Sequence, residues 1–230
     1  VGGINHKKTT ENMKTLLFAL LLLGSASALR AQYKFTEADS LRGTLTPLRT
    51  CYDVRFYDLN IAIDFATRRI AGYNEIVYHV RTGFNMLQVD LFSNMQVDSV
   101  VHHGKKVKFH RKHNAVFIDL GEMQEADKLD TLRIYYQGQP RIAVNAPWDG
   151  GFTWTKDRNS KDWVAVSCEG IGASLWWPNK DHLSDEPDSM RIRCTVPSQY
   201  ECISNGILRA KTVNPKPKSK GKKKPAPPQT

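Results

Sequence analysis

A two-residue alternation of apolar and polar side chains, repeated in short runs, constrains this chain more than any other feature. In the first run, Tyr57, Leu59, Ile61, Ile63 and Phe65 alternate with Asp58, Asn60, Ala62 and Asp64. Because successive side chains of a β-strand point to opposite faces, the run predicts a strand with one apolar and one largely polar face.

Further runs of this kind follow, and short polar turns separate them. Their apolar positions are Ile76, Tyr78 and Val80; Leu87, Val89 and Leu91; Val97 to Val101; Val107 to Phe109; Val116, Ile118 and Leu120; Leu132, Ile134 and Tyr136; and Met190, Ile192, Cys194 and Val196. His103-Gly104 and Asn205-Gly206 have the composition of tight hairpin turns. The pattern predicts an all-β domain over residues 32–208, either an antiparallel β-sandwich or a curved, saddle-like sheet.

The composition changes after Gly138-Gln139-Pro140, where aromatic residues gather around Asp149-Gly150-Gly151. They are Trp148, Phe152, Trp154 and Trp163. We expect a hairpin or looped lobe with exposed aromatic surface. This surface either lines a peptide groove or is a small aromatic core beneath long loops.

The segment from Val164 to Met190 is the least ordinary in composition. Glu169 follows an alternating run and precedes Gly170, so it is expected where a strand ends and the backbone turns. Close to Trp176 and Trp177, its carboxylate can be partly desolvated and available to a cation. The simpler interpretation is that Trp-Trp-Pro plugs one end of the domain and Glu169 is solvated at the edge.

This segment resembles the end of the N-terminal β-domain in zinc aminopeptidases of the aminopeptidase N type, a gluzincin family. That family has Glu or Gln nine residues before the Pro of an aromatic-Pro-Cys-x-Asp-Glu-Pro motif. Here Glu169 stands nine residues before Pro178, which follows Trp177, and Asp185-Glu186-Pro187 comes later. Residues 52–59, Y-D-V-R-F-Y-D-L, are similar to the family's opening strand, so the resemblance covers most of the chain.

The chain departs from the family pattern at two points. Asn179 stands at the usual Cys position, and a four-residue insertion containing His182-Leu183-Ser184 precedes Glu186-Pro187. Both departures fall in the loop beside the expected site.

The N-terminal residues have the composition of a leader. Residues 1–12 are polar and precede Met13, and the run from Leu16 to Leu23 ends in small residues. We interpret residues 1–31 as upstream residues and a secretory signal peptide cleaved after Ala28 or Ala31, because the run is too short for a membrane span. We therefore expect an exported protein, periplasmic or extracellular, without a stable membrane span after cleavage.

The net charge of +10 is concentrated at the two ends of the chain. Residues 209–230 contribute +8 and residues 1–31 contribute +3, which leaves −1 for residues 32–208. A nucleic-acid partner is therefore not indicated. Residues 209–230, rich in Lys and Pro, are predicted to be a disordered tail.

The cysteine and histidine patterns do not predict a metal site. An exported protein permits disulfides, and Cys194 and Cys202 are placed to face each other across a hairpin, while Cys51 and Cys168 complete the set. The chain has no H-E-x-x-H motif. Adjacent strand residues point to opposite faces, so His102-His103 is expected to be a poor chelate.

The resemblance therefore implies the N-terminal, substrate-amine-anchoring portion of an exported zinc metallo-aminopeptidase. Glu169 would bind the free α-amino group of a peptide, with Gly170, Trp176 and Trp177 as further substrate-binding candidates. Zinc and the catalytic residues would belong to a separate catalytic domain of the parent enzyme. The alternatives are a secreted, non-catalytic β-sandwich module that binds peptide or carbohydrate, and a purely structural domain.

Overall fold

The computed structural model describes residues 34–213, and the chain divides between Leu41 and Arg42 into two compact units. The predictions for residues 1–31 and for the tail from residue 214 onward lie outside the described residues. Helix α2 (Glu37–Gly43) begins in the first unit and ends in the second, and the Thr36 and Asp39 side chains cap its start by accepting hydrogen bonds from each other's backbone N–H groups, at 2.8 and 3.3 Å. No helix within residues 34–213 is long and apolar enough to cross a membrane.

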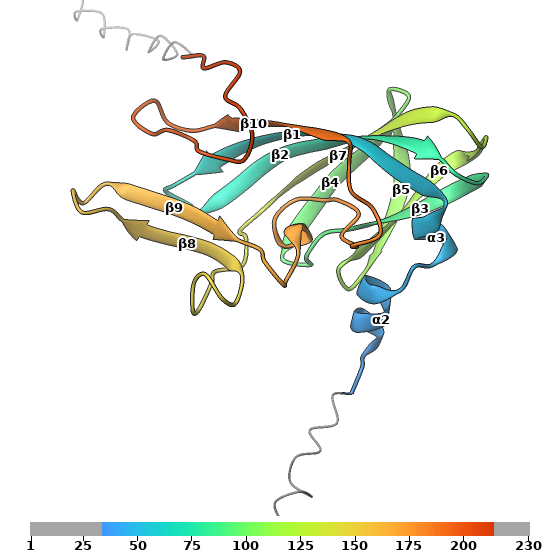
Figure 1. Cartoon of the computed structure of the whole chain (residues 1–230), viewed down its shortest axis with the longest axis horizontal. Coiled ribbons are helices and arrows are strands. Elements are labelled where there is room, and N and C mark those ends of the chain that lie inside the picture. The colour runs from blue at the N-terminus through green and yellow to red at the C-terminus, as the bar shows by residue number, and fades with distance from the viewer. Residues whose placement is uncertain (1–33, 214–230) are drawn as a thin grey trace, which may run out of the picture. The chain divides into compact units, whose positions relative to one another are not determined.

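The second unit is dominated by one sheet of eight strands (Figure 1). The sheet order is β10-β1-β2-β7-β4-β5-β6-β3. In chain order the strands are β1 (Tyr52–Asp64), β2 (Arg69–Val80), β3 (Phe84–Asp90), β4 (Met95–His102), β5 (Lys105–Lys112), β6 (Ala115–Gln124), β7 (Leu129–Gly138) and β10 (Ser189–Thr195). The prediction of an all-β domain with a curved sheet is confirmed.

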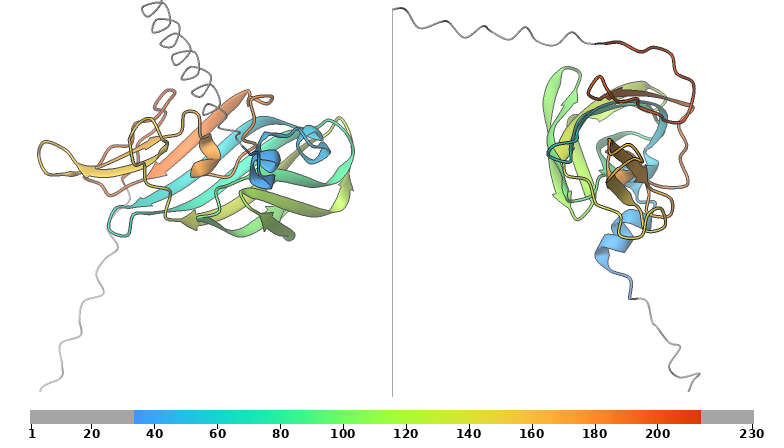
Figure 2. Two further views of the ribbon diagram at one scale, coloured as in Figure 1. Left: turned by 90° about the horizontal axis from the view of Figure 1, so that it is seen from below. Right: turned by 90° about the vertical axis from the view of Figure 1, so that its left-hand side faces the viewer.

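The sheet curls strongly on itself, as the end-on view in Figure 2 shows. The registers shift between Val54 and Phe56 and between Val97 and Ser99, and such irregularities increase local twist and bend. The curl gives the sheet a concave face on which the chain can bury apolar side chains.

Strand β10 pairs in parallel with β1, with Phe56 opposite Ser189 and Ala62 opposite Thr195. The sheet is consequently mixed and not purely antiparallel. A parallel neighbour requires a long crossover, and residues 65–188 of the chain, containing all the other strands, separate the two.

The core follows the predicted alternation. Buried side chains on the inner face include Leu59, Ile61, Ile76, Tyr78, Val89, Ile118, Leu132 and Ile134. The short helix α3 (Pro47–Thr50), which the sequence analysis did not predict, begins with Pro at its first position and precedes β1 directly.

The aromatic-rich segment forms the hairpin of β8 (Gly151–Lys156) and β9 (Asp162–Ser167), as expected. Phe152 is buried and Trp154 packs against the core, whereas Trp148 and Trp163 are exposed. The interpretation as an aromatic core therefore holds for Phe152 and Trp154, whereas the peptide groove stays a prediction. The one-turn helix η1 (Ala173–Leu175) follows, in the segment from β9 to β10.

The predicted hairpin at Asn205-Gly206 is wrong. The backbone bends there, but residues 203–207 form no strand, and Ile203 and Ile207 are exposed. Without another strand or a core surface to cover them, two short runs gain too little from pairing to form an independent hairpin.

Candidate functional site

Glu169 lies on the turn that follows β9, as the sequence predicts. The Ile171 N–H donates to the Glu169 carbonyl at 2.8 Å, and the Gly172 N–H donates to the Cys168 carbonyl at 2.8 Å. The Glu169 side chain is exposed. The expected desolvation of the Glu169 carboxylate by the two tryptophans does not occur. Both Trp side chains pack against the core, and Glu169 stays exposed to solvent.

Trp176 and Trp177 pack against each other and against the core. Their rings are 6.2 Å apart at 67°, and the Trp177 ring meets the Tyr57 ring edge-on at 5.0 Å. Trp177 is buried, and Trp176 is partly buried against Phe152. This geometry supports the plug interpretation for Trp177, and Gly170 is exposed.

The chain after Trp177 is fixed to the sheet by backbone groups. The Asn74 amide donates to the Pro178 carbonyl at 2.8 Å, and Asn179 forms a two-way bridge with Asp90 at 2.7 and 3.1 Å. Asn179 therefore pairs with the end of β3 as one further bridge. Asn179, which stands where the family pattern has Cys, is buried.

A buried charge pair supports this attachment. Arg49 of α3 donates to Asp90 at 2.6 Å, and the other Asp90 oxygen accepts the Asp181 N–H at 3.1 Å. Burial raises the pKa of Asp90 to about 6 despite the opposing effect of Arg49. Asp90 is thus largely ionised at neutral pH and balances the guanidinium.

A second buried pair holds the next part of the loop. Lys180 donates to Asp185 at 2.5 Å and to the Tyr52 carbonyl at 2.7 Å, and its ammonium lies 4.6 Å from the centre of the Tyr52 ring. Asp185 also accepts the Val54 N–H at 3.2 Å. The segment from Trp177 to Asp185 is therefore bound to β1, β2 and β3, and it directly follows the turn that carries Glu169 and the helix η1.

Sequence reasoning missed this network. Asp185 was part of the quoted Asp-Glu-Pro motif, but Arg49 and Asp90 have no local signal, because they are 41 positions apart and meet only through folding. The one available sign was the concentration of charged residues at positions 180–186, inside an otherwise aromatic segment.

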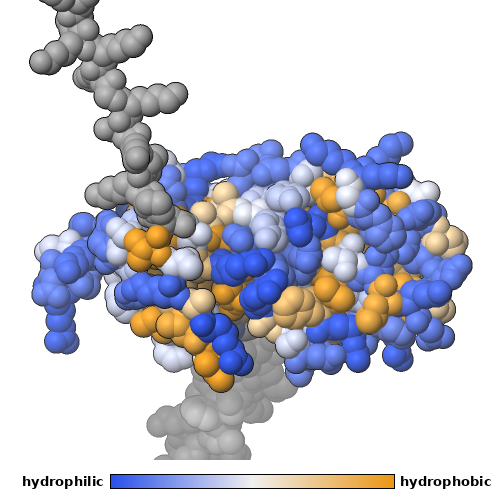
Figure 3. Space-filling view, turned by 90° about the horizontal axis from the view of Figure 1, so that it is seen from above, coloured by the Kyte–Doolittle hydropathy of each residue, from blue (hydrophilic) through white to orange (hydrophobic). Residues whose placement is uncertain are grey.

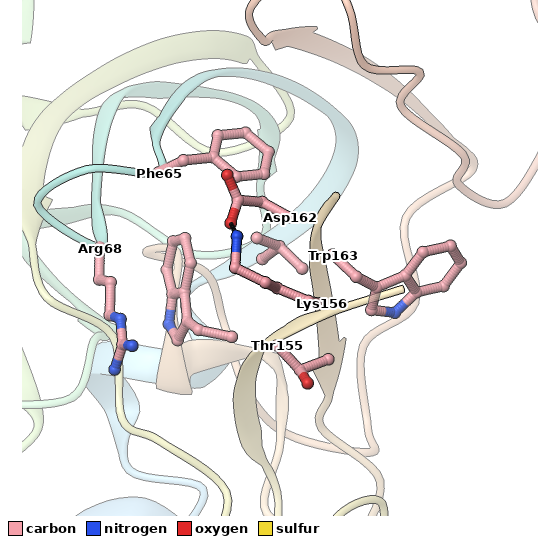
Figure 4. A pocket seen from close by; sticks show the side chains of 8 residues that line it. Phe65, Arg68, Thr155, Lys156, Asp162 and Trp163 are labelled. Atoms are coloured by element: carbon pink, nitrogen blue, oxygen red, sulfur yellow. Dashed lines mark hydrogen bonds and ion pairs between the residues drawn. The ribbon is translucent and has the colours of Figure 1, made fainter. Parts of the chain in front are cut away.

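Two hollows of this domain lie away from Glu169. One cavity of about 360 Å³ is lined by residues of β8, β9 and the β1–β2 turn (Figure 4). They include Phe65, Arg68, Lys156 and Asp162. Lys156 and Asp162 form an ion pair at 2.8 Å across it, and the Trp163 ring extends away from that pair. Glu169 lines neither this cavity nor the adjacent one beside Tyr200.

The face shown in Figure 3 is mixed in character. Hydrophobic residues form separate groups between hydrophilic ones, without one continuous apolar area. This face gives no sign of a large apolar docking surface.

The four cysteines are free thiols in the structure. The Cys194 and Cys202 thiols are hydrogen-bonded to each other, which raises the pKa of Cys194 and lowers that of Cys202 to about 7. These two residues meet as expected, although no hairpin joins them. Cys168 and Cys194 pack against the core.

No protein-family model matches this sequence, and no curated protein matches it. Solved structures match the fold. An M1 zinc metallopeptidase from Deinococcus radiodurans is 20% identical with a TM-score of 0.57, covering 71% of this chain and 36% of its own. A mutant two-domain M1 zinc metallopeptidase bound to L-tryptophan is 21% identical with a TM-score of 0.59, covering 71% and 37%.

Native leukotriene A4 hydrolase from Saccharomyces cerevisiae is more distant. It is 18% identical with a TM-score of 0.51, and the match covers 73% of this chain and 26% of the hydrolase. This chain thus spans about a third of the length of the first metallopeptidases that it resembles. The predicted resemblance is confirmed in the fold: the described β-domain has a fold found in M1 zinc metallopeptidases.

Proposed function

We propose that this chain is the substrate-amine-anchoring domain of an exported zinc metallo-aminopeptidase, an enzyme that removes N-terminal residues from peptides. The observation that carries the proposal is the position of Glu169: an exposed carboxylate on a turn directly before a segment anchored to the sheet, in a domain with the M1 fold. Similar structures include metallopeptidases bound to amino acids and to a tripeptide substrate.

The chemical role of Glu169 in this proposal is electrostatic. A free α-amino group is an ammonium ion that can donate charge-assisted hydrogen bonds to the carboxylate, whereas an internal peptide bond presents no cation. Binding the chain end at this point would select exopeptidase substrates. The chain has no H-E-x-x-H motif, so the catalytic zinc does not fit its residues and would be held by another part of the parent enzyme.

The test is kinetic and uses the complete protein encoded by the reading frame that contains this chain. Glu169→Gln removes the charge and keeps the shape. We expect kcat/KM on an aminoacyl p-nitroanilide to fall about 10- to 100-fold, from the loss of one charge-assisted bond. Activity on the matching N-acetylated substrate, which has no ammonium, should stay at its wild-type level.

Glu125→Gln is the matched control, because Glu125 is an exposed carboxylate on the β6–β7 turn with one surface partner, Lys128, at 3.6 Å. It should leave both rates unchanged. Equal kinetics for Glu169→Gln and the wild type on the free-amine substrate would remove Glu169 from the site. A complete protein without H-E-x-x-H would remove the peptidase proposal itself.

A second function, a non-catalytic module for peptide or carbohydrate, is favoured by the exposed Trp163 at the 360 Å³ cavity. Binding of short oligosaccharides or tripeptides to the 230-residue chain can be followed by tryptophan fluorescence. If this function is correct, Trp163→Ala should abolish the signal and Glu169→Gln should not.

A further inference from the structure

Outside the site above, the described residues contain a compact group of histidines and carboxylates at one end of the sheet. His102 ends β4, His103 opens the β4–β5 turn, Asp130 lies near the start of β7 and Glu122 near the end of β6. His102, His103 and Asp130 offer ligand atoms that all lie within 4.8 Å of one another.

The two histidines are on the same side, contrary to the expectation from strand alternation. Their rings stack with centres 3.9 Å apart and planes at 26°. The reason is the turn: His103 has φ +48° and Gly104 has φ +76°, so the backbone reverses at His103 and its ring returns over His102. The prediction that this pair is a poor chelate is therefore wrong in its geometric premise.

Both rings present the same edge to one carboxylate. Nε2 of His102 lies 2.7 Å from one Asp130 oxygen, and Nε2 of His103 lies 2.9 Å from the other. On the opposite edge, the Nδ1 atoms of the two rings are 3.8 and 3.3 Å from Glu122 Oε1. The two Nε2 atoms and the Asp130 carboxylate are a donor set suited to a first-row transition metal.

Asp130 is held in place independently of the histidines. The Tyr78 hydroxyl donates to it at 3.3 Å and the Thr131 N–H at 2.6 Å. The carboxylate is thus oriented before any ion binds, as a metal ligand should be.

Access and burial also suit an ion. The side chains of His102 and Asp130 are 2% and 9% exposed, while those of His103 and Glu122 are 59% and 60% exposed. One wall is therefore rigid and the other open to solvent. Ligands 2.0–2.2 Å from a tetrahedral Zn²⁺ lie about 3.3 Å apart, so the Nε2–Asp130 distances need to widen by only about half an ångström.

We propose that His102, His103 and Asp130 bind one divalent transition-metal ion of the Zn²⁺ type, with water completing the coordination. In the metal-free protein, each imidazole donates its Nε2–H to Asp130, and the bound ion takes the place of these two protons. The site is formed by β4, the β4–β5 turn and β7.

The test is a titration of the chelator-treated 230-residue chain with Zn²⁺ alone, by isothermal calorimetry. We expect one equivalent to bind with micromolar affinity. His103→Gln and Asp130→Asn should each weaken binding about 10-fold or more. His110→Gln is the control, because His110 is exposed on β5, in the same hairpin, and stacks on Phe117; it should bind as the wild type does.

A second measurement guards against variants that fail to fold. In wild-type protein with labelled histidines, one equivalent of Zn²⁺ should shift the ring nitrogen resonances of His102 and His103 and leave those of His110 in place. Unchanged affinity in both His103→Gln and Asp130→Asn, or shifts spread over all histidines, would overturn the proposal. Peptidase activity enters neither readout, so this result is independent of the function proposed above.

Discussion

At the scale of single residues, the geometry of the Glu169 turn depends on glycine. Gly172 has φ +90°, and a Cβ placed there would lie 2.0 Å from the Asp181 carboxylate oxygen that accepts the Ser174 hydroxyl at 2.6 Å. Gly170 also has a positive φ, +72°, but a Cβ there would meet open space. A side chain at Gly170 would therefore cause backbone strain alone, whereas a side chain at Gly172 would also collide with Asp181.

This difference predicts unequal costs for two alanine substitutions. Gly170→Ala should lower the free energy of unfolding by about 1 kcal/mol, the cost of a left-handed residue with a side chain. Gly172→Ala should lower it by about 2–4 kcal/mol, because the methyl group also displaces Asp181. Urea unfolding of the two variants measures both values, and equal costs would contradict the steric argument.

At the scale of secondary structure, β10 is held to β1 by charge as well as by its ladder. The Asp58 carboxylate is buried and accepts bonds from Arg191 at 3.0 Å and from Arg193 at 2.5 Å. The hydrogen bond from Arg191 is the main cause that lowers the pKa of Asp58. A strand at the sheet edge, added after a long crossover, gains from such side-chain fixation.

Asp58→Asn should therefore release β10 more than it destabilises the rest of the sheet. The opening free energy of the β10 amides in hydrogen exchange should fall by about 1.5–3 kcal/mol, the value of hydrogen bonds to a charged group. Because the folded pKa is depressed, this stabilisation is present above the unfolded pKa, near 3.8, and is lost as the pH falls below it.

Asp53→Asn is the control for Asp58→Asn. Asp53 is also on β1, and it pairs with the half-exposed Arg55 at 3.1 Å. Such surface pairs contribute little, so β10 protection should be unchanged. Loss of protection throughout the sheet in Asp58→Asn would show instead that the carboxylate supports the whole domain.

At the scale of the whole molecule, Asp90 joins parts of the fold that are far apart in sequence. Asp90, at the end of β3, pairs with Arg49 of α3. It also contacts the loop after Trp177, through its backbone bridge to Asn179 and through the Asp181 N–H that its carboxylate accepts. The free energy of unfolding should therefore depend on its ionisation.

Comparison with Asp90→Asn isolates this dependence. The folded pKa of about 6 is above the ordinary value of 3.8, so the folded state holds the Asp90 proton more tightly. The stability of the wild type relative to the variant should be greatest below pH 3.8 and fall by roughly 3 kcal/mol in all as the pH rises through 6. Urea unfolding between pH 4 and 7 measures it, and a difference independent of pH would refute the assignment.

The sequence by itself determined the strands and the turn that carries Glu169. Alternation in runs such as Tyr57 to Phe65 is a local property, because one face of each strand must be apolar wherever the strand lies in the sheet. The same holds for the His103-Gly104 turn, whose residue types suit the positive φ angles that a two-residue hairpin needs.

Only the tertiary structure decided the parallel placement of β10, the burial of Trp177 away from Glu169, and the pairing of Arg49 with Asp90. It also brought His102, His103 and Asp130 together, against the expectation from strand periodicity. The physical reason is that these contacts join residues far apart in the chain or depend on a single backbone angle. Their energies arise from burial and charge pairing in the folded state, which no local pattern of residues encodes.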